Sequence, residues 1–209
     1  MRYKEIVFDV DGTLIDTEYA VLHSLQETVF RFTGNTPDLD ALTFALGITG
    51  KDALVRLQIE DVDCALTFWE QTLNTYKDTV QVFDGIEMLL RDLTTKGLRL
   101  GIVTSKTREE YETDFARFDI ERYFTTIICA DDTAKHKPNP DPLVKYMEKS
   151  GCRRTDILYI GDSIYDRRCA EAAHCDFALA LWGAKRGMDG VRAFAAPGDR
   201  DYPKDCVNL

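Results

Sequence analysis

The stretch Phe8-Asp9-Val10-Asp11-Gly12-Thr13-Leu14 decides how this chain is interpreted. It completes the apolar run Ile6-Val7-Phe8, which predicts a buried strand. Side chains two residues apart point to the same face of an extended chain, so Asp9 and Asp11 are expected to face one pocket. Gly12 permits a sharp turn of the backbone away from them. Two converging carboxylates repel each other unless a cation or a shared proton lies between them.

The composition is that of an ordinary globular protein, with 209 residues, 44% hydrophobic and 30% charged. This length fits one large domain, or a core with a smaller insertion. The net charge of −10 is uneven, because residues 16–81 hold four basic and eleven acidic side chains and so contribute −7. An acidic surface repels nucleic acids and anionic membranes, so neither is expected as a partner.

No segment of the sequence predicts export or membrane insertion. The residues before Ile6 contain no apolar signal segment, and no stretch is long and apolar enough to cross a bilayer. The six cysteines are scattered and form no CxxC pair, and no histidine has the spacing to complete a zinc site with them. We therefore expect a cytoplasmic protein with free thiols.

Residues 16–81 predict helices and no strand. Apolar residues recur at helical spacing in three segments, at about 17–32, 39–46 and 64–79. Between the last two segments, Thr49 and Asp52 have the spacing of a capping box, which predicts the start of a further helix. The stretch is therefore interpreted as an all-helical insertion after the first strand.

Strands and helices alternate from Val82 onward. Apolar strands are predicted at 98–103, 126–129, 157–160 and 177–181. Continuous apolar strands that alternate with helices indicate a parallel sheet covered on both faces. The expected fold class is therefore α/β: a Rossmann-like core formed by residues 1–15 and 82–209, with an inserted all-helical domain over 16–81. After Gly183 the signals weaken, and residues 195–199 predict a turn.

Two further segments carry candidate phosphate-binding residues: the end of the predicted strand at 98–103, and a lysine before a proline farther along the chain. Thr104 and Ser105 offer hydroxyl and backbone N–H groups to an anionic oxygen. Lys137 stands before Pro138, which favours an extended backbone at the lysine. Taken alone, helix capping explains the hydroxyls, and a solvated surface position explains the lysine.

Two further carboxylates, Asp162 and Asp166, follow the strand at 157–160. Ligands of open parallel sheets bind beyond the carboxyl ends of the strands, where Asp9 and Asp11 are also expected. Clustered carboxylates there require a hard cation, and oxygen ligands suit Mg²⁺. A metal ion, a lysine and hydroxyl donors together make a site for a phosphoryl group.

The motifs resemble those of the haloacid dehalogenase superfamily of phosphatases. DVDGTL at 9–14 matches the first motif, the strand ending in Thr104 the second, Lys137-Pro138 the third and GDSIYD at 161–166 the fourth, in the family's order. The helical insertion lies where the family's cap domain lies, and the resemblance extends to about residue 185. Among the subgroups, the chain is similar to phosphoglycolate-phosphatase-like enzymes with a small helical cap.

The resemblance implies a role for each motif residue. Asp9 would be the nucleophile that forms an aspartyl-phosphate, and Asp11 would protonate the leaving oxygen and then activate water. Asp9, the backbone carbonyl of Asp11 and Asp162 would ligate Mg²⁺. Thr104 and Lys137 would hold the transferring oxygens. The acid at position 11 favours phosphoryl transfer, because the dehalogenases of the superfamily lack it.

Supporting roles follow for four other residues. Gly12 and Ser105 are expected at the substrate, and Asp166 would orient Lys137 or a metal-bound water. Residues 46–52 are the candidate specificity segment of the cap, because a helix N-terminus there offers free N–H groups to an anion. Lys51 adds positive charge to that segment, so we expect it to contact the substrate.

Three functions remain open at this point. The first is a Mg²⁺-dependent phosphatase of a small phosphorylated metabolite. The second is a β-phosphoglucomutase-like phosphomutase, whose relatives carry an early histidine in the first cap helix; here Ala20 and Val21 stand there, and His23 follows. The third is a non-catalytic phosphate-binding regulatory protein. Phosphoglycolate, a sugar phosphate, a nucleoside monophosphate and pyrophosphate all remain candidate substrates, and both a monomer and a homodimer remain open.

Overall fold

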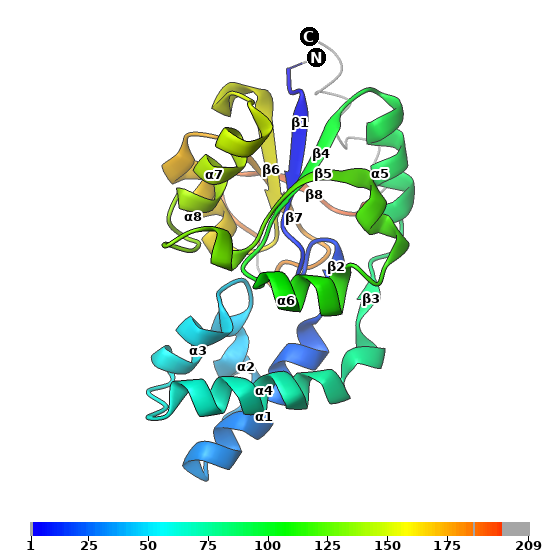
Figure 1. Cartoon of the computed structure of the whole chain (residues 1–209). Coiled ribbons are helices and arrows are strands. Elements are labelled where there is room, and N and C mark those ends of the chain that lie inside the picture. Colours follow the sequence, from blue (N-terminus) through cyan, green and yellow to red (C-terminus); the bar gives the residue numbers. More distant parts are fainter. Residues whose placement is uncertain (1, 186, 198–209) are drawn as a thin grey trace.

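A parallel sheet of six strands forms the core in the computed structural model, which describes residues 2–185 and 187–197 (Figure 1). The strand order is β5-β4-β1-β6-β7-β8, and every neighbouring pair is parallel. The strands are β1 (Glu5–Phe8), β4 (Arg99–Val103), β5 (Phe124–Ile128), β6 (Ile157–Gly161), β7 (Asp176–Ala180) and β8 (Arg192–Phe194). The expected α/β fold class is therefore confirmed.

Helices cover both faces of the sheet, as Figure 1 shows. They are α5 (Ile86–Thr95), α6 (Arg108–Glu110), which continues into the π-helical turn η3 (Tyr111–Phe115), α7 (Asp141–Ser150) and α8 (Ile164–Ala173). Ile6 and Phe8 of β1 pack in the cluster that includes the α5 leucines, whereas Val7 packs with residues of α7 and α8. This alternation explains why the strand is apolar at every position.

The core also contains short 3₁₀ turns between its main elements. These are η4 (Asp119–Tyr123), η5 (Ala130–Asp132) and η6 (Arg154–Asp156). The η5 turn leads into the segment that carries Lys137 ahead of α7.

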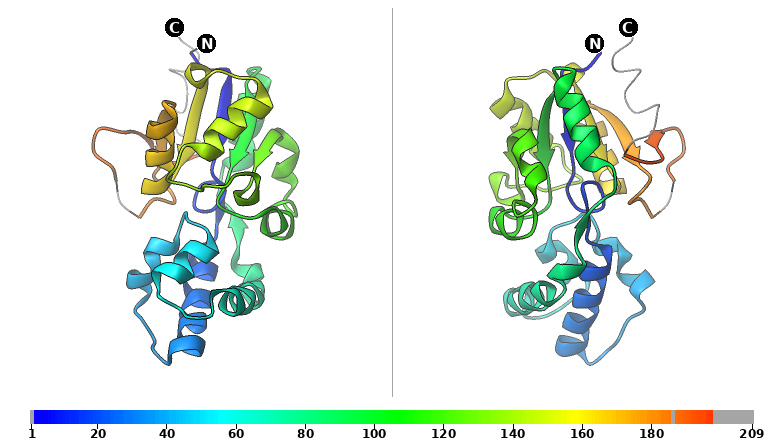
Figure 2. Two further views of the ribbon diagram at one scale, coloured as in Figure 1. Left: turned by 60° about the vertical axis from the view of Figure 1, so that its left-hand side comes forward. Right: turned by 90° about the vertical axis from the view of Figure 1, so that its right-hand side faces the viewer.

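The helical region before the core is a cap with its own apolar cluster, set apart from the sheet in both views of Figure 2. It consists of α1 (Glu18–Thr33), α2 (Leu39–Leu42), η1 (Thr43–Ala45), α3 (Gly50–Arg56), α4 (Val62–Thr75) and η2 (Lys77–Thr79). The predicted N-cap residue of α3 is confirmed, because Thr49 Oγ1 accepts a hydrogen bond from the Asp52 N–H. No described helix has the length and apolar character needed to cross a bilayer.

Two short strands join the cap to the core. β2 (Ile15–Asp16) pairs antiparallel with β3 (Gln81–Val82). The prediction that residues 16–81 contain no strand was wrong for its two end residues, Asp16 and Gln81, which pair with each other. Strands of two residues carry no periodic signal, and their pairing depends on the return of the chain from the cap. The division into a core of 1–15 and 82–209 and a cap of 16–81 stays a proposal.

The segment after Gly183 contains a strand that the sequence did not predict. β8 pairs with the end of β7 and extends the sheet by one edge strand. Its three residues include Arg192 and pair with one strand, β7, in the described part of the chain, and they show no continuous apolar run. Of the turn predicted at 195–199, residues 198 and 199 lie outside the described residues.

Candidate active site

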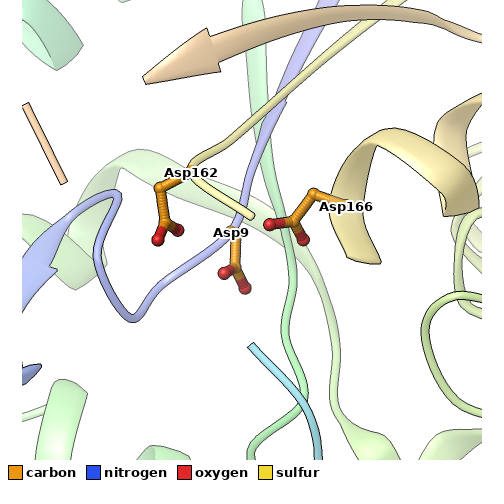
Figure 3. Close-up of side chains that lie close together, drawn as sticks. All are labelled: Asp9, Asp162 and Asp166. Carbon is orange, nitrogen blue, oxygen red and sulfur yellow. The ribbon is translucent and has the colours of Figure 1, made fainter. Parts of the chain in front are cut away.

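Three carboxylates gather at the carboxyl end of the sheet, as Figure 3 shows. Asp9 directly follows β1, Asp162 follows the neighbouring strand β6, and Asp166 lies in the first turn of α8. One oxygen from each of the three lies within 4.8 Å of the others. The parallel pairing of β1 with β6 brings these strand ends together, as expected from the sequence.

Lys137 lies between two of these carboxylates. Its Nζ donates hydrogen bonds to Asp9 Oδ1 at 2.8 Å and to Asp166 Oδ1 at 2.7 Å, and only 3% of the residue is exposed. Burial alone would lower the pKa of the ammonium, but the carboxylates of Asp166 and Asp9 raise it above its ordinary value. Lys137 is therefore a fixed cation beside Asp9.

Asp166 is held on both of its oxygens. Oδ1 accepts hydrogen bonds from Lys137 and from Tyr159 Oη, and Oδ2 accepts from the backbone N–H of Ser163. A methyl group on Gly161 would lie 2.5 Å from Asp166 Cγ, so this approach requires glycine. The arrangement agrees with the expected orienting role toward Lys137.

Burial and mutual repulsion oppose ionisation of the carboxyl groups in this cluster. Burial raises the pKa of Asp9 to about 7, with Lys137 acting in the opposite direction and Asp166 and Asp11 adding to the rise. Loss of solvent raises the pKa of Asp162 well above its usual range, and the carboxylates of Asp166 and Asp9 raise it further. One lysine does not balance these carboxylates, and a bound divalent cation would.

The donor set fits Mg²⁺. The described residues that meet here offer carboxylate oxygens, which are the ligands that this ion prefers. Gly12, with φ of 74°, leaves room for Asp162, since a methyl group on Gly12 would lie 2.4 Å from Asp162 Oδ2. Thr13 Oγ1 donates to Asp162 Oδ1 at 3.0 Å and fixes the carboxylate in this direction.

Asp11 faces the same cavity as Asp9 but stands outside the carboxylate cluster. Its Oδ1 lies 3.3 Å from Nζ of Lys106, which also donates to Asp114 Oδ2 at 2.8 Å. Burial alone would lower the pKa of Lys106, but the carboxylates of Asp11, Asp114 and Glu110 raise it. Lys106 is a site residue that the sequence reasoning missed, although it directly follows Ser105.

The hydroxyl residues after β4 take different positions. Thr104 is buried, and its Oγ1 accepts a hydrogen bond from the Lys106 N–H at 3.2 Å. Ser105 lines the cavity beside Asp9, and its Oγ donates to the Gly47 carbonyl of the cap at 2.9 Å. The Ser105 hydroxyl thus joins the core to the cap. The backbone N–H of Ser105 would be the group that remains to donate to a substrate.

A cavity of about 70 Å³ lies between this cluster and the cap. The core contributes Asp9, Asp11, Ser105, Lys106 and Glu110, and the cap contributes mainly apolar side chains. The expected contact from Lys51 is not part of this arrangement. Lys51 does not line the cavity; it is exposed on α3, with Nζ 3.4 Å from Asp63 Oδ1.

Gly183 is a second position that the sequence reasoning did not identify. It lines another cavity, of about 220 Å³, together with Asp11, Gly12 and Asp162. A methyl group on Gly183 would lie 1.7 Å from the Gly12 carbonyl oxygen, so the two backbones pack in direct contact. The segment after β7 thus supports the turn that carries Asp11 and Gly12.

The sequence pattern that describes the haloacid dehalogenase-like hydrolase family matches residues 6–180 of this chain. The chain belongs to this family. It is 30% identical over 204 residues to pyrophosphatase PpaX of Halalkalibacterium halodurans, a match that covers 97% of this chain and 92% of the relative. As a haloacid dehalogenase-like hydrolase, it has the family's fold and cap, and the four predicted motifs occur within the matched range.

Solved structures agree with this membership. A protein from Lactobacillus plantarum, named as a candidate phosphoglycolate phosphatase, is 31% identical and superimposes with a TM-score of 0.85 over 94% of this chain and 97% of that one. A hydrolase from Pseudomonas syringae gives a TM-score of 0.85 at 23% identity over 98% and 99% of the two chains, which speaks for the fold alone.

Proposed function

We propose that this hydrolase is a Mg²⁺-dependent phosphatase that cleaves a small phosphorylated metabolite through an aspartyl-phosphate on Asp9. The observation that carries the proposal is the position of Asp9. Its carboxylate meets Lys137, Asp162 and Asp166 at the sheet end and also faces the cavity under the cap. A carboxylate nucleophile beside a fixed ammonium suits attack on a phosphoryl group.

The residues divide the reaction into two displacements. An oxygen of Asp9 attacks phosphorus, and the ester P–O bond breaks while Asp11 gives its proton to the leaving alcohol oxygen. Asp11 then takes a proton from water, which attacks the phosphorus of the aspartyl-phosphate and frees Asp9 and inorganic phosphate. Asp11 lines the same cavity as Asp9, which suits it to both proton transfers.

Other residues hold the phosphoryl group and the nucleophile. Lys137, Thr104 and the backbone N–H of Ser105 would bind the oxygens of the phosphoryl group, and Thr104 Oγ1 also accepts a hydrogen bond from the Lys106 N–H. Mg²⁺, held by Asp9, Asp162 and the Asp11 carbonyl, would supply positive charge to the transferring oxygens. Asp166 keeps Lys137 in place through a 2.7 Å hydrogen bond.

The phosphomutase alternative receives no support from the position of His23. Its ring stacks on Tyr19 with centroids 3.9 Å apart, and Nδ1 lies 2.9 Å from the Tyr19 carbonyl oxygen. His23 does not line the cavity beside Asp9. Hydrolysis is also the activity in the names of two relatives, a pyrophosphatase and a candidate phosphoglycolate phosphatase, and both of their substrates are small phosphorylated molecules.

The test is phosphate release with Mg²⁺ from a panel of small phosphate esters, p-nitrophenyl phosphate and pyrophosphate. The wild-type protein is expected to release phosphate, whereas Asp9→Asn should release almost none because the nucleophile is gone. Circular dichroism should show that both proteins are folded, since asparagine keeps the shape of the side chain. Equal release by the two proteins would refute the role of Asp9, and no release by either would refute the phosphatase function.

A further inference from the structure

The cap side of the cavity is mainly apolar. Its large apolar side chains come from α1, the η1–α3 segment and α4: Val21, Leu46, Ile48, Leu66, Trp69 and Leu73. Trp69 is buried, and its indole N–H donates to Ser24 Oγ at 2.9 Å inside the cap. The one polar atom of this large side chain is therefore already bonded, and Trp69 offers carbon atoms to the cavity.

Among the residues that the structure describes, Lys106 is the single basic side chain in the cavity lining. Its ammonium is already paired with Asp114 at 2.8 Å and Asp11 at 3.3 Å. The four basic residues of the cap stand elsewhere, since none of Arg31, Lys51, Arg56 and Lys77 lines the cavity. A second negative group on a substrate would meet no free ammonium or guanidinium in this lining.

Two acidic side chains increase this bias. Glu70 of the cap and Glu110 of the core both line the cavity. Burial raises the pKa of Glu70, and the carboxylates of Glu110 and Glu109 raise it further, as expected where negative charges approach one another. An anionic leaving group would be desolvated here against carboxylates, whereas an alkyl group would gain apolar contact.

We infer that the cap selects phosphate monoesters whose leaving group is an uncharged, apolar alcohol, and disfavours phosphoglycolate and pyrophosphate. The inference rests on the proposed phosphatase function and assigns the substrate class of the same site. The specificity residues are Leu66, Trp69 and Leu73, which form the apolar part of the α4 lining. The chain thus differs in substrate class from the activities that its relatives' names state.

The test compares leaving groups of equal size. n-Butyl phosphate, phosphoglycolate and pyrophosphate lose groups with the same number of non-hydrogen atoms, which are respectively neutral, carboxylate-bearing and phosphate. With Mg²⁺ and the wild-type chain, kcat/KM for n-butyl phosphate is expected to be at least tenfold higher than for either of the other two. Equal or faster turnover of phosphoglycolate or pyrophosphate would overturn the inference, and so would tenfold preference for 3-aminopropyl phosphate.

A matched pair of variants tests whether α4 is responsible. Leu73→Lys places an ammonium in the cavity lining, whereas Asn74→Lys adds the same charge at the next, exposed position of the helix. Leu73→Lys is expected to lower the ratio of n-butyl phosphate to phosphoglycolate turnover at least tenfold, and Asn74→Lys to leave it unchanged. An equal change in both variants, or none in either, would contradict the assignment to Leu73.

The proposed phosphatase function and the inferred leaving-group specificity can be refuted separately. If the wild-type chain releases phosphate from p-nitrophenyl phosphate but prefers phosphoglycolate, the phosphatase function stands and the apolar specificity is refuted. If it releases phosphate from no ester, both are refuted. Should Leu73→Lys not fold, as judged by circular dichroism, the wild-type comparison alone still decides the inference.

Discussion

Lys137 shows how much of the site depends on one side chain. Its ammonium bonds Asp9 after β1 and Asp166 in α8, and so joins two parts of the core that are far apart in sequence. All three residues are at most 3% exposed. A buried carboxylate needs such a partner, because an unpaired buried charge is strongly destabilising. The same contact that stabilises the core therefore fixes the direction of Asp9.

Gly12 offers a prediction at this scale, with Gly34 as its control. Both have a φ near 73°, but a methyl group on Gly12 would collide with Asp162 whereas one on Gly34 would meet nothing within 4 Å. Each alanine variant should lose about 1 kcal/mol of stability from backbone strain. Only Gly12→Ala should also weaken Mg²⁺ activation, by about 10- to 100-fold, because it displaces a proposed ligand.

Thermal unfolding and Mg²⁺ titration of phosphatase activity measure the two effects. An unchanged Mg²⁺ requirement in Gly12→Ala would show that the carboxylate of Asp162 does not hold the ion. A matching loss in Gly34→Ala would assign the effect to backbone strain instead.

The sequence placed carboxylates after several strands of one parallel sheet, whereas contacts that depend on side-chain direction could not be read from it. Asp9 and Asp162 meet because β1 and β6 are neighbours in the sheet. Lys106 was missed because its partner Asp114 comes from the π-helical turn, and such contacts leave no periodic pattern. The expected contact of Lys51 with a substrate stays a prediction; in the structure its Nζ lies 3.4 Å from Asp63 Oδ1.

At the scale of elements, the start of α3 links the cap to the cavity. Thr49 caps this helix through the Asp52 N–H at 3.2 Å, and the preceding residues Leu46, Gly47 and Ile48 line the cavity. A capping side chain thus fixes the chain direction where the lining segment ends. Asp61 is the N-cap residue of α4 in the same way, since its Oδ1 accepts a hydrogen bond from the Cys64 N–H at 3.1 Å. Asp61 does not line the cavity.

The N-cap residues Thr49 and Asp61 can be compared directly by substitution. Thr49→Ala and Asp61→Ala should each lower stability by about 1 kcal/mol, because each leaves a helix N–H without its partner. Only Thr49→Ala should raise KM severalfold for the best ester, since it loosens the 46–48 segment. Urea unfolding and steady-state kinetics measure the two effects. A rise in KM of the same size in Asp61→Ala would show that general loosening of the cap is the cause.

The elements themselves were predicted well where they are long or fully apolar. The strands β1, β4 and β6 lie where apolar runs placed them, and α3 begins directly after its predicted N-cap, Thr49. β2 and β3 were not predicted, because two-residue strands exist only through their mutual pairing. β8 was missed for a related reason. It is short and lies at the edge of the sheet beside β7, where the strand does not need to be apolar at every position.

At the scale of the whole molecule, the cavity exists because the cap lies against the sheet end. Contacts between the two parts include Ser105 Oγ to the Gly47 carbonyl at 2.9 Å and Tyr165 Oη to the Phe44 carbonyl at 3.2 Å. Lys185 pairs with Glu18 across the same boundary. These pairs join residues from distant parts of the sequence, so the sequence alone implied a lid but not which side chains would line it.

The central claim is that Asp9 carries the phosphoryl group between two steps, both of which involve Asp11. The measurement is acid quenching of the reaction of Asp11→Asn with p-nitrophenyl phosphate and Mg²⁺, followed by peptide mass mapping. Nitrophenolate leaves without a proton, so the first step should persist while hydrolysis of the intermediate slows. Hydroxylamine-sensitive phosphate is expected on the peptide that contains Asp9. Nitrophenolate release with no phosphate on Asp9, or with phosphate on another residue, would contradict it.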